Sequence, residues 1–131
     1  MPDSTPASSL FPRKFPRRGE IYIVDFGEPR GSAQAGKRPA VVVSNDVGNQ
    51  HSPVVIVAAM TSKKVQQRRK YPTVVFVPAG EMKGDGLIVC NQLLTIDKAD
   101  LIAYKAVLTQ PQVDELNEAL RVGVGIPRRF V

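Results

Sequence analysis

A loop of small residues that leads directly into a β-branched strand is the feature that most limits how this chain can fold. Residues 31–46 read GSAQAGKRPAVVVSND. The Gly- and Ala-rich half has a mobile backbone, whereas the valines after Pro39 favour a buried strand. A residue that precedes proline is pushed into an extended conformation. We therefore predict that Arg38 has an extended backbone at the start of a strand, where its side chain can bind anions arriving from solvent. The alternative is that Arg38 only caps a strand edge or pairs with a surface carboxylate.

The rest of the chain reads mostly as strands. Apolar or β-branched runs predict strands at residues 21–26, 40–44, 54–61, 73–77, 87–96 and 103–108, the fifth being one long strand or two short ones. Residues 45–52 read as a turn, and the basic run at residues 62–72 as an exposed loop. Thr109 and Gln112 have capping-box spacing and predict a helix that starts at Thr109. The expected fold is a small, mainly β, strongly curved antiparallel sheet with a C-terminal helix against it.

Length and charge place limits on the function. The 131 residues suit one domain, and the net charge of +6, with an isoelectric point near 9.8, favours a polyanionic or acidic partner. Residues 1–18 hold four prolines and four basic residues, so we predict a disordered basic arm there and a folded domain at residues 19–131. We find no candidate membrane span and no secretory signal, and we expect a cytoplasmic protein.

Most of the familiar catalytic constellations are missing from the sequence. One histidine, His51, and one cysteine, Cys90, cannot form a two-histidine ribonuclease site or a zinc cluster. Cys90 lies in an apolar run and reads as core, and His51 reads as a surface residue. The GSAQAG stretch lacks Walker-type spacing and precedes a strand, not a helix. We therefore expect neither a metal nor a cofactor.

The remaining candidates are Arg38, at the start of one predicted strand, and Thr61, at the end of the next. In an antiparallel pair these two positions lie at the same end of the sheet, so we expect Arg38 and Thr61 to be neighbours. A guanidinium holds phosphate with a bidentate fork, and a hydroxyl adds one donor and one acceptor. Such a pair can hold a phosphodiester while an internal 2′-OH attacks it. Arg38 would stabilise charge or donate a proton in a strongly perturbed site, and would be a poor base.

Four motifs, in order, resemble the MazF/PemK family of toxin–antitoxin ribonucleases. They are RGEIYIVDF at residues 18–26, GSAQAGKRPAVVVSND at 31–46, MTS at 60–62 and DGLIVCNQLLTI at 85–96. The resemblance covers roughly residues 18–125. It implies an SH3-like barrel of the CcdB/Kid/MazF type with a terminal helix, which forms a homodimer. It also implies metal-independent cleavage of single-stranded RNA to a 2′,3′-cyclic phosphate and a 5′-hydroxyl, and a cognate antitoxin with a flexible acidic segment.

The resemblance also implies roles for individual residues. Arg38 and Thr61 match the family's catalytic arginine and threonine. The implied RNA-binding positions are Phe26, Ser32, Gln34, Lys37, Ser62, Lys63, Lys64 and Gln92. Ala33 stands where many members have glutamate, and this departure affects either the base specificity or the coupling between the loop and Arg38, but it leaves both catalytic positions in place.

Two rival functions keep a similar fold. One is a CcdB-like poison of DNA gyrase, which would act through a C-terminal tail containing Trp-Gly-Ile, but the chain has no tryptophan. The other is a non-catalytic RNA-binding barrel, which would explain the basic segment but not the pairing of Arg38 with Thr61.

Overall fold

The fold is one curled antiparallel sheet that carries a C-terminal helix. The computed structural model describes residues 10–28, 31, 35–80 and 82–128. Within these residues the six strands follow the order β4-β5-β3-β2-β1-β6, and every neighbouring pair is antiparallel. The elements are β1 (Glu20–Asp25), β2 (Lys37–Val42), α2 (Asp46–His51), β3 (Val54–Thr61), α3 (Val65–Arg68), β4 (Val74–Val77), β5 (Gly86–Asp97), η1 (Lys98–Asp100), β6 (Leu101–Val107) and α4 (Gln110–Gly123). The predicted mainly β fold with a terminal helix is confirmed.

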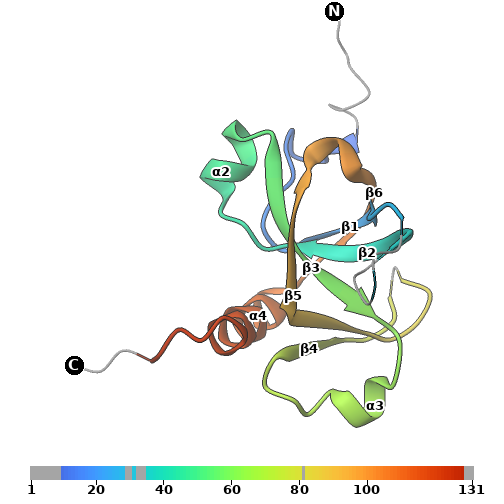
Figure 1. Ribbon diagram of the computed structural model, residues 1–131, viewed down its shortest axis with the longest axis vertical. Helices are drawn as coiled ribbons and strands as arrows, with labels where there is room; N and C mark the ends of the chain where they lie inside the picture. Colours follow the sequence, from blue (N-terminus) through green and yellow to red (C-terminus); the bar gives the residue numbers. More distant parts are fainter. Residues whose placement is uncertain (1–9, 29–30, 32–34, 81, 129–131) are drawn as a thin grey trace, which may run out of the picture.

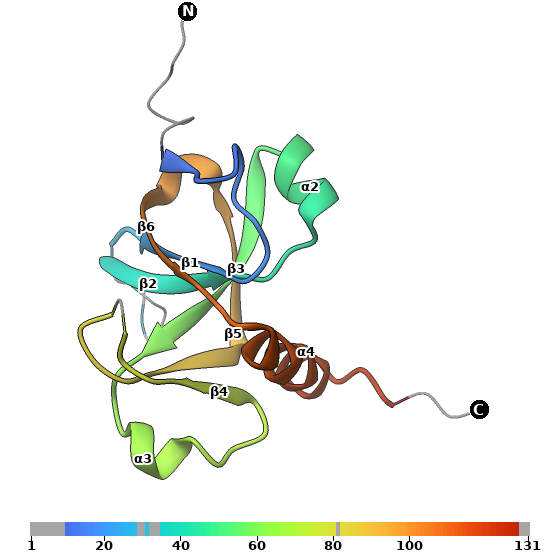
Figure 2. The same ribbon diagram turned by 180° about the vertical axis from the view of Figure 1, so that it is seen from behind.

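The sheet is curled because its long strands bend. The pairing of β3 with β5 shifts register between Ala58 and Met60, which allows both strands to turn there. Figures 1 and 2 show β3 and β5 running from the part formed by β1, β2 and β6 to the part formed by β4. The single long strand β5 settles the choice that the sequence left open over residues 87–96.

Both faces of the central strands are buried, which explains their unbroken β-branched runs. Along β2, Val41 packs into one core cluster, while Ala40 and Val42 pack into another. Along β1, Ile21 packs into the cluster that contains Val41, and Tyr22 packs into the cluster that contains Ala40 and Val42. Successive side chains of a strand point to opposite faces, so a strand covered on both sides needs apolar residues throughout.

Helix α4 closes one of these clusters against β4 and β5. The predicted capping box is present: Gln112 N donates to Thr109 Oγ1 at 3.3 Å, and Thr109 N donates to Gln112 Oε1 at 2.9 Å. Leu116 is fully buried within the cluster beneath the helix. Among the described helices, none has the length and apolar character needed to cross a membrane.

Two segments that the sequence reads as turn or loop contain short helices. Residues 46–51 form α2, since Asn45 Oδ1 accepts a hydrogen bond from Gly48 N at 2.8 Å and so caps the first turn. The buried Asn49 stabilises this helix by donating to Ser44 O at 2.8 Å. The basic run forms α3, whose Val65 is buried. The prediction of a wholly exposed loop there is wrong, because one apolar residue anchors the helix.

The predicted disordered arm is wrong for residues 10–18, and residues 1–9 lie outside the described residues. Phe11 is buried and meets the Tyr22 ring edge-on, with 5.8 Å between ring centroids. Arg17 N donates to the buried Glu20 carboxylate at 2.7 Å. Figures 1 and 2 both show this segment at the end of the molecule that carries η1 and α2. Proline density disfavours helix and strand here, but it does not prevent an irregular segment from packing.

Candidate functional site

Strand pairing brings Arg38 and Thr61 to the same place. The pairing of β2 with β3 sets Ala40 opposite Ala59, so Arg38 and Thr61 lie at the same end of these two strands. Both residues line one pocket of about 350 Å³. The neighbourhood expected from the antiparallel connection is therefore present.

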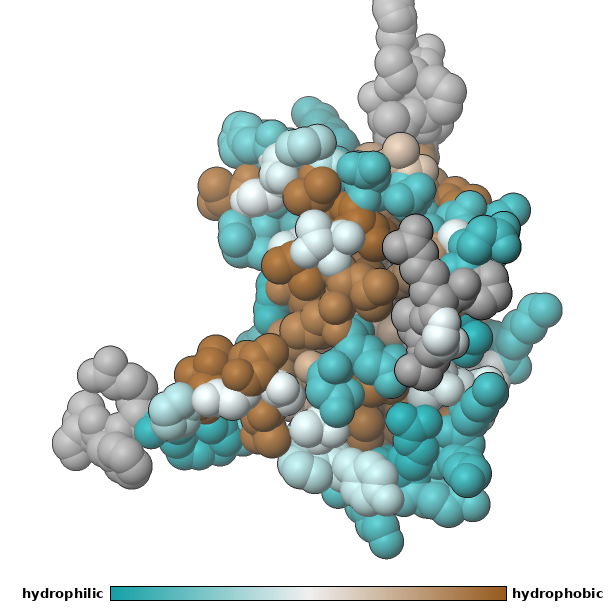
Figure 3. Space-filling view, in the orientation of Figure 1, coloured by the Kyte–Doolittle hydropathy of each residue, from teal (hydrophilic) through white to brown (hydrophobic). Residues whose placement is uncertain are grey.

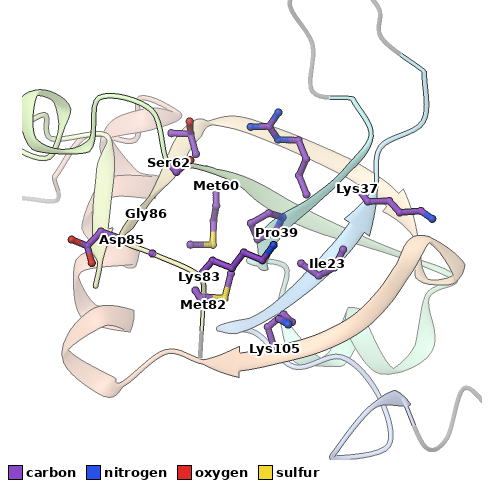
Figure 4. A pocket seen from close by; sticks show the side chains of 13 residues that line it. Ile23, Lys37, Pro39, Met60, Ser62, Met82, Lys83, Asp85, Gly86 and Lys105 are labelled. Carbon is purple, nitrogen blue, oxygen red and sulfur yellow. The ribbon is translucent and has the colours of Figure 1, made fainter. Parts of the chain in front are cut away.

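The pocket is built from strand ends and one turn (Figure 4). Strands β1, β2, β3 and β6 form its wall, and the turn between β4 and β5 forms the opposite side. The lining residues are Ile23, Lys37, Arg38, Pro39, Met60, Thr61, Ser62, Met82, Lys83, Gly84, Asp85, Gly86 and Lys105. Met60 and Met82 give it an apolar centre, and the polar groups surround them.

The Arg38 guanidinium is available for a ligand. Its backbone is paired with Val24 inside the sheet, so the base of the side chain is fixed, and the side chain itself is half-buried. No hydrogen bond or ion pair joins it to any residue that the structure describes. A half-buried guanidinium without a carboxylate partner retains its donors for an anion.

The Thr61 hydroxyl is already oriented by the backbone. Its Oγ1 accepts a hydrogen bond from Lys63 N at 3.2 Å, where β3 ends. Because one lone pair of the oxygen is occupied by this donor, the O–H proton remains free to point elsewhere. Thr61 can therefore donate to an oxygen of a ligand held beside Arg38.

The pocket carries a strong excess of positive charge. Lys37, Arg38, Lys83 and Lys105 line it, with Asp85 as the single carboxylate among the described lining residues. Asp85 Oδ1 accepts a hydrogen bond from Ala79 N at 2.7 Å, so this carboxylate also closes the turn. Four cations against one occupied carboxylate favour a polyanion.

The other sequence-predicted RNA-binding residues are dispersed. Lys37 and Ser62 line the pocket, whereas Lys63 and Lys64 are exposed just beyond it. Phe26 is half-buried against the core, and Gln92 is exposed on β5; neither lines the pocket. Ser32 and Gln34, together with Ala33, lie outside the described residues.

Other titratable candidates are excluded from this chemistry. His51 is exposed at the end of α2, before β3 begins, whereas the pocket lies where β3 ends. Cys90 is fully buried, and its burial raises the pKa of the thiol to about 12, so it is a core residue and a poor nucleophile. Among the described residues, His, Cys, Asp and Glu side chains form no group of three or more that could hold a metal ion.

Comparison with protein families decides the assignment. A model described as the PemK-like, MazF-like toxin of type II toxin–antitoxin systems matches residues 17–124. The chain belongs to this PemK/MazF-like family. A relative from Staphylococcus saprophyticus, named Endoribonuclease MazF, is 37% identical over 112 residues, which is 84% of this chain and 92% of the relative.

Solved structures agree with the fold of this PemK/MazF-like chain. A mycobacterial structure titled as an endoribonuclease in complex with its cognate antitoxin gives a TM-score of 0.69 at 27% identity, covering 87% of this chain and 99% of the other. MazF from Deinococcus radiodurans gives 0.71 at 22% identity, covering 86% and 98%, a likeness of fold.

The PemK/MazF-like motifs did not reveal every residue of the pocket. Lys83, Asp85 and Lys105 line it, yet none was identified as a site residue from the sequence. Lys83 and Asp85 lie in a glycine-rich turn that gives only a turn signal. Lys105 is a single lysine in a predicted strand, and its arrival at the pocket depends on the pairing of β6 with β1.

Proposed function

We propose that this PemK/MazF-like chain is the toxin of a type II toxin–antitoxin system and an endoribonuclease that cleaves single-stranded RNA, mRNA in the cell, at a short sequence. The observation that carries the proposal is the meeting of Arg38 and Thr61 in one cationic pocket. Family membership and the 37% identical relative named Endoribonuclease MazF support it. Action on mRNA under antitoxin control implies a cytoplasmic location.

The proposed reaction needs no metal. The 2′-oxygen of the substrate attacks the adjacent phosphorus and loses its proton, while the bond from phosphorus to the 5′-oxygen breaks and that oxygen gains a proton. The products are a 2′,3′-cyclic phosphate and a 5′-hydroxyl. Arg38 stabilises the extra negative charge on the phosphorane oxygens, and Thr61 donates a hydrogen bond to one of them.

The remaining contacts would hold the strand. Lys37 and Ser62 lie at the pocket, and the exposed Lys63 and Lys64 would bind phosphates beyond it in a sequence-independent way. Phe26, Ser32, Gln34 and Gln92 remain proposed RNA-binding residues, and Phe26 could stack on a base.

Two protein partners complete the proposal. A cognate antitoxin with an acidic flexible segment would occupy the cationic pocket, as a mycobacterial neighbour was solved with its antitoxin. We also propose a homodimer. Figure 3 shows apolar surface over the region of β3 and β5 and along α4. Exposed apolar side chains there include Ile56 on β3, and Val124 and Ile126 directly after α4. Contiguous apolar surface of this kind is typical of protein interfaces.

The test is cleavage of a long single-stranded RNA in EDTA, with mapping of the new 5′ ends. Wild-type protein should cut at one shared short sequence. Arg38→Ala and Thr61→Val should each lower the rate on the order of 10²- to 10³-fold, the usual loss for one oriented donor. Thr61→Ser, which keeps the hydroxyl, is the matched control and should retain most of the activity.

Circular dichroism and gel filtration would confirm that each variant folds and assembles as wild type does. A folded wild-type protein that cuts no RNA would overturn the proposal. RNA binding without cleavage would then favour the non-catalytic barrel, and inhibition of DNA supercoiling would favour the gyrase poison. Full activity of Arg38→Ala would remove Arg38 from the mechanism.

A further inference from the structure

Lys105 occupies an irregular position in its strand. On β6, Tyr104 pairs with Tyr22 and Ala106 pairs with Ile21, so two successive residues of β1 face three of β6. Lys105 is the extra residue of this β-bulge. Bulges redirect a side chain, and they occur often beside active sites. Here the bulged lysine lines the pocket, although β6 is an edge strand of the sheet.

The order of the strands sets the distance between Lys105 and the proposed catalytic pair. Thr61 is on β3, Arg38 on β2 and Lys105 on β6, and β1 lies between β2 and β6. Neighbouring strands are about 4.8 Å apart, and Arg38 pairs with Val24 whereas Lys105 lies level with Ile21 and Tyr22. The two strand spacings together with this offset along β1 place the backbone of Lys105 more than roughly 10 Å from that of Arg38, and farther still from Thr61. A single phosphate bound by Arg38 and Thr61 therefore lies away from the part of the pocket that Lys105 lines.

Lys83 reaches the pocket from the opposite wall. The turn that carries it is closed by the hydrogen bond from Ala79 N to the Asp85 carboxylate. Figure 4 shows Lys105 on the side of the pocket away from Ser62, and the side chain of Lys83 reaching toward the middle of the pocket. Neither lysine has an ion pair with any described residue. Two ammonium groups that face one space, neither paired with a described carboxylate, concentrate positive charge there, which a phosphate would neutralise.

We propose that Lys105 and Lys83 bind a second RNA phosphate, the one that adjoins the phosphate held by Arg38 and Thr61. This inference rests on the proposed function and adds to it a path for the RNA strand across β3, β2, β1 and β6. The apolar centre made by Met60 and Met82 lies between the two phosphate positions and is suited to the nucleoside that joins them. Lys105 and Lys83 are thus positioning residues, which hold the strand so that the scissile phosphate meets Arg38.

The test uses a short RNA that carries the mapped cut sequence, with a 2′-deoxy nucleotide at the cut to prevent cleavage. Lys105→Gln should weaken binding roughly three- to tenfold and reduce the slope of log K against log salt by about 0.7, the value for one phosphate of a single strand. Lys83→Gln should act in the same direction. Lys105→Arg, which keeps the charge, should restore most of the affinity. Lys98→Gln is the matched control, because Lys98 follows β5 at the far end of β3 from Thr61, and it should change neither quantity.

A second measurement identifies the phosphate. Replacing one phosphate at a time with a neutral methylphosphonate should weaken wild-type binding at the phosphate beside the scissile one. Lys105→Gln should be insensitive to that single replacement and remain sensitive to the others. An unchanged salt slope, or a loss spread equally over all phosphates, would overturn the second site while wild-type cleavage leaves the proposed function standing. Absence of wild-type cleavage would overturn both.

Discussion

The Cys90 thiol lies between β5 and α4, with no exposed surface. Burial removes the water that would stabilise a thiolate, and this is the main reason why its pKa rises from 9.0 to about 12. The nearby Arg18 acts in the opposite direction but does not reverse the effect. At the scale of one residue, solvent access therefore decides that the thiol is structural.

This shift predicts a loss of stability in alkali. Well below pH 9 the thiol is protonated in both the folded and the unfolded protein, so its ionisation takes nothing from the free energy of unfolding. As the pH rises from about 9 toward 12, the unfolded state ionises while the folded state retains its proton, and the free energy of unfolding should fall by at most about 1.4 kcal/mol per pH unit. Urea unfolding of wild type at pH 8 and pH 10 measures this change.

Cys90→Ala is the matched control for that experiment. Tyr22, whose pKa is raised mainly by burial and also by its hydrogen bond to Glu20, contributes to alkaline loss in both proteins. The variant should therefore decline less than wild type over this range. Identical declines would show that the thiol ionises as readily in the folded state as in the unfolded one.

At the scale of elements, α4 approaches β5 more closely than a side chain allows. A Cβ atom at Gly123, the last residue of α4, would lie 2.5 Å from the carbonyl oxygen of Cys90. That oxygen belongs to the backbone of a central strand, so it cannot move aside cheaply. The missing side chain thus permits the helix to close the core cluster that contains Leu116 and Ala119.

Gly123→Ala should consequently destabilise the protein by roughly 1–3 kcal/mol, the usual cost of overpacking, although alanine is the better helix former. Thermal or urea unfolding measures the change. Gly80→Ala is the control, because a Cβ at Gly80 meets nothing within 4 Å. If Gly123→Ala is as stable as Gly80→Ala, the helix end can shift without loss.

At the scale of the whole molecule, the positive charges behind the net charge of +6 are unevenly distributed. The pocket contains four cations, and the segment after Thr61 adds Lys63, Lys64 and the basic end of α3. These groups extend the positive surface outward from the end of β3. A polyanionic strand that enters the pocket would therefore be held along this surface as well.

Neutralising Lys63 and Lys64 together should weaken RNA binding and lower the salt slope by about 1.4, which corresponds to two phosphate contacts on a single strand. Binding titrations at several KCl concentrations give the slope. The control is Lys14→Gln combined with Lys98→Gln, which removes the same charge from residues outside the pocket and its basic border. Equal slopes for the two double variants would show that the segment after Thr61 does not face RNA.

Several features of this chain follow from local rules and could be predicted from the sequence. The β-branched runs predict the strands, because such residues fit a strand whose two faces are both covered. The capping box predicts α4 from Thr109 and Gln112 alone. Even the meeting of Arg38 with Thr61 follows from one antiparallel connection. Each of these rules acts within a few residues or across one turn.

Other features were decided only by tertiary structure. Phe11 packs on Tyr22, and Val65 anchors α3, because the core offers each of them an apolar surface that no local pattern reveals. Lys105 reaches the pocket because β6 pairs with β1, far away in the sequence, and because the register slips by one residue there. A register shift turns a side chain toward a different space, and it depends on the fit of the whole sheet. The sequence by itself determined the strands, the terminal helix and the Arg38–Thr61 pair, whereas the place of Lys105 in the pocket depended on long-range strand pairing.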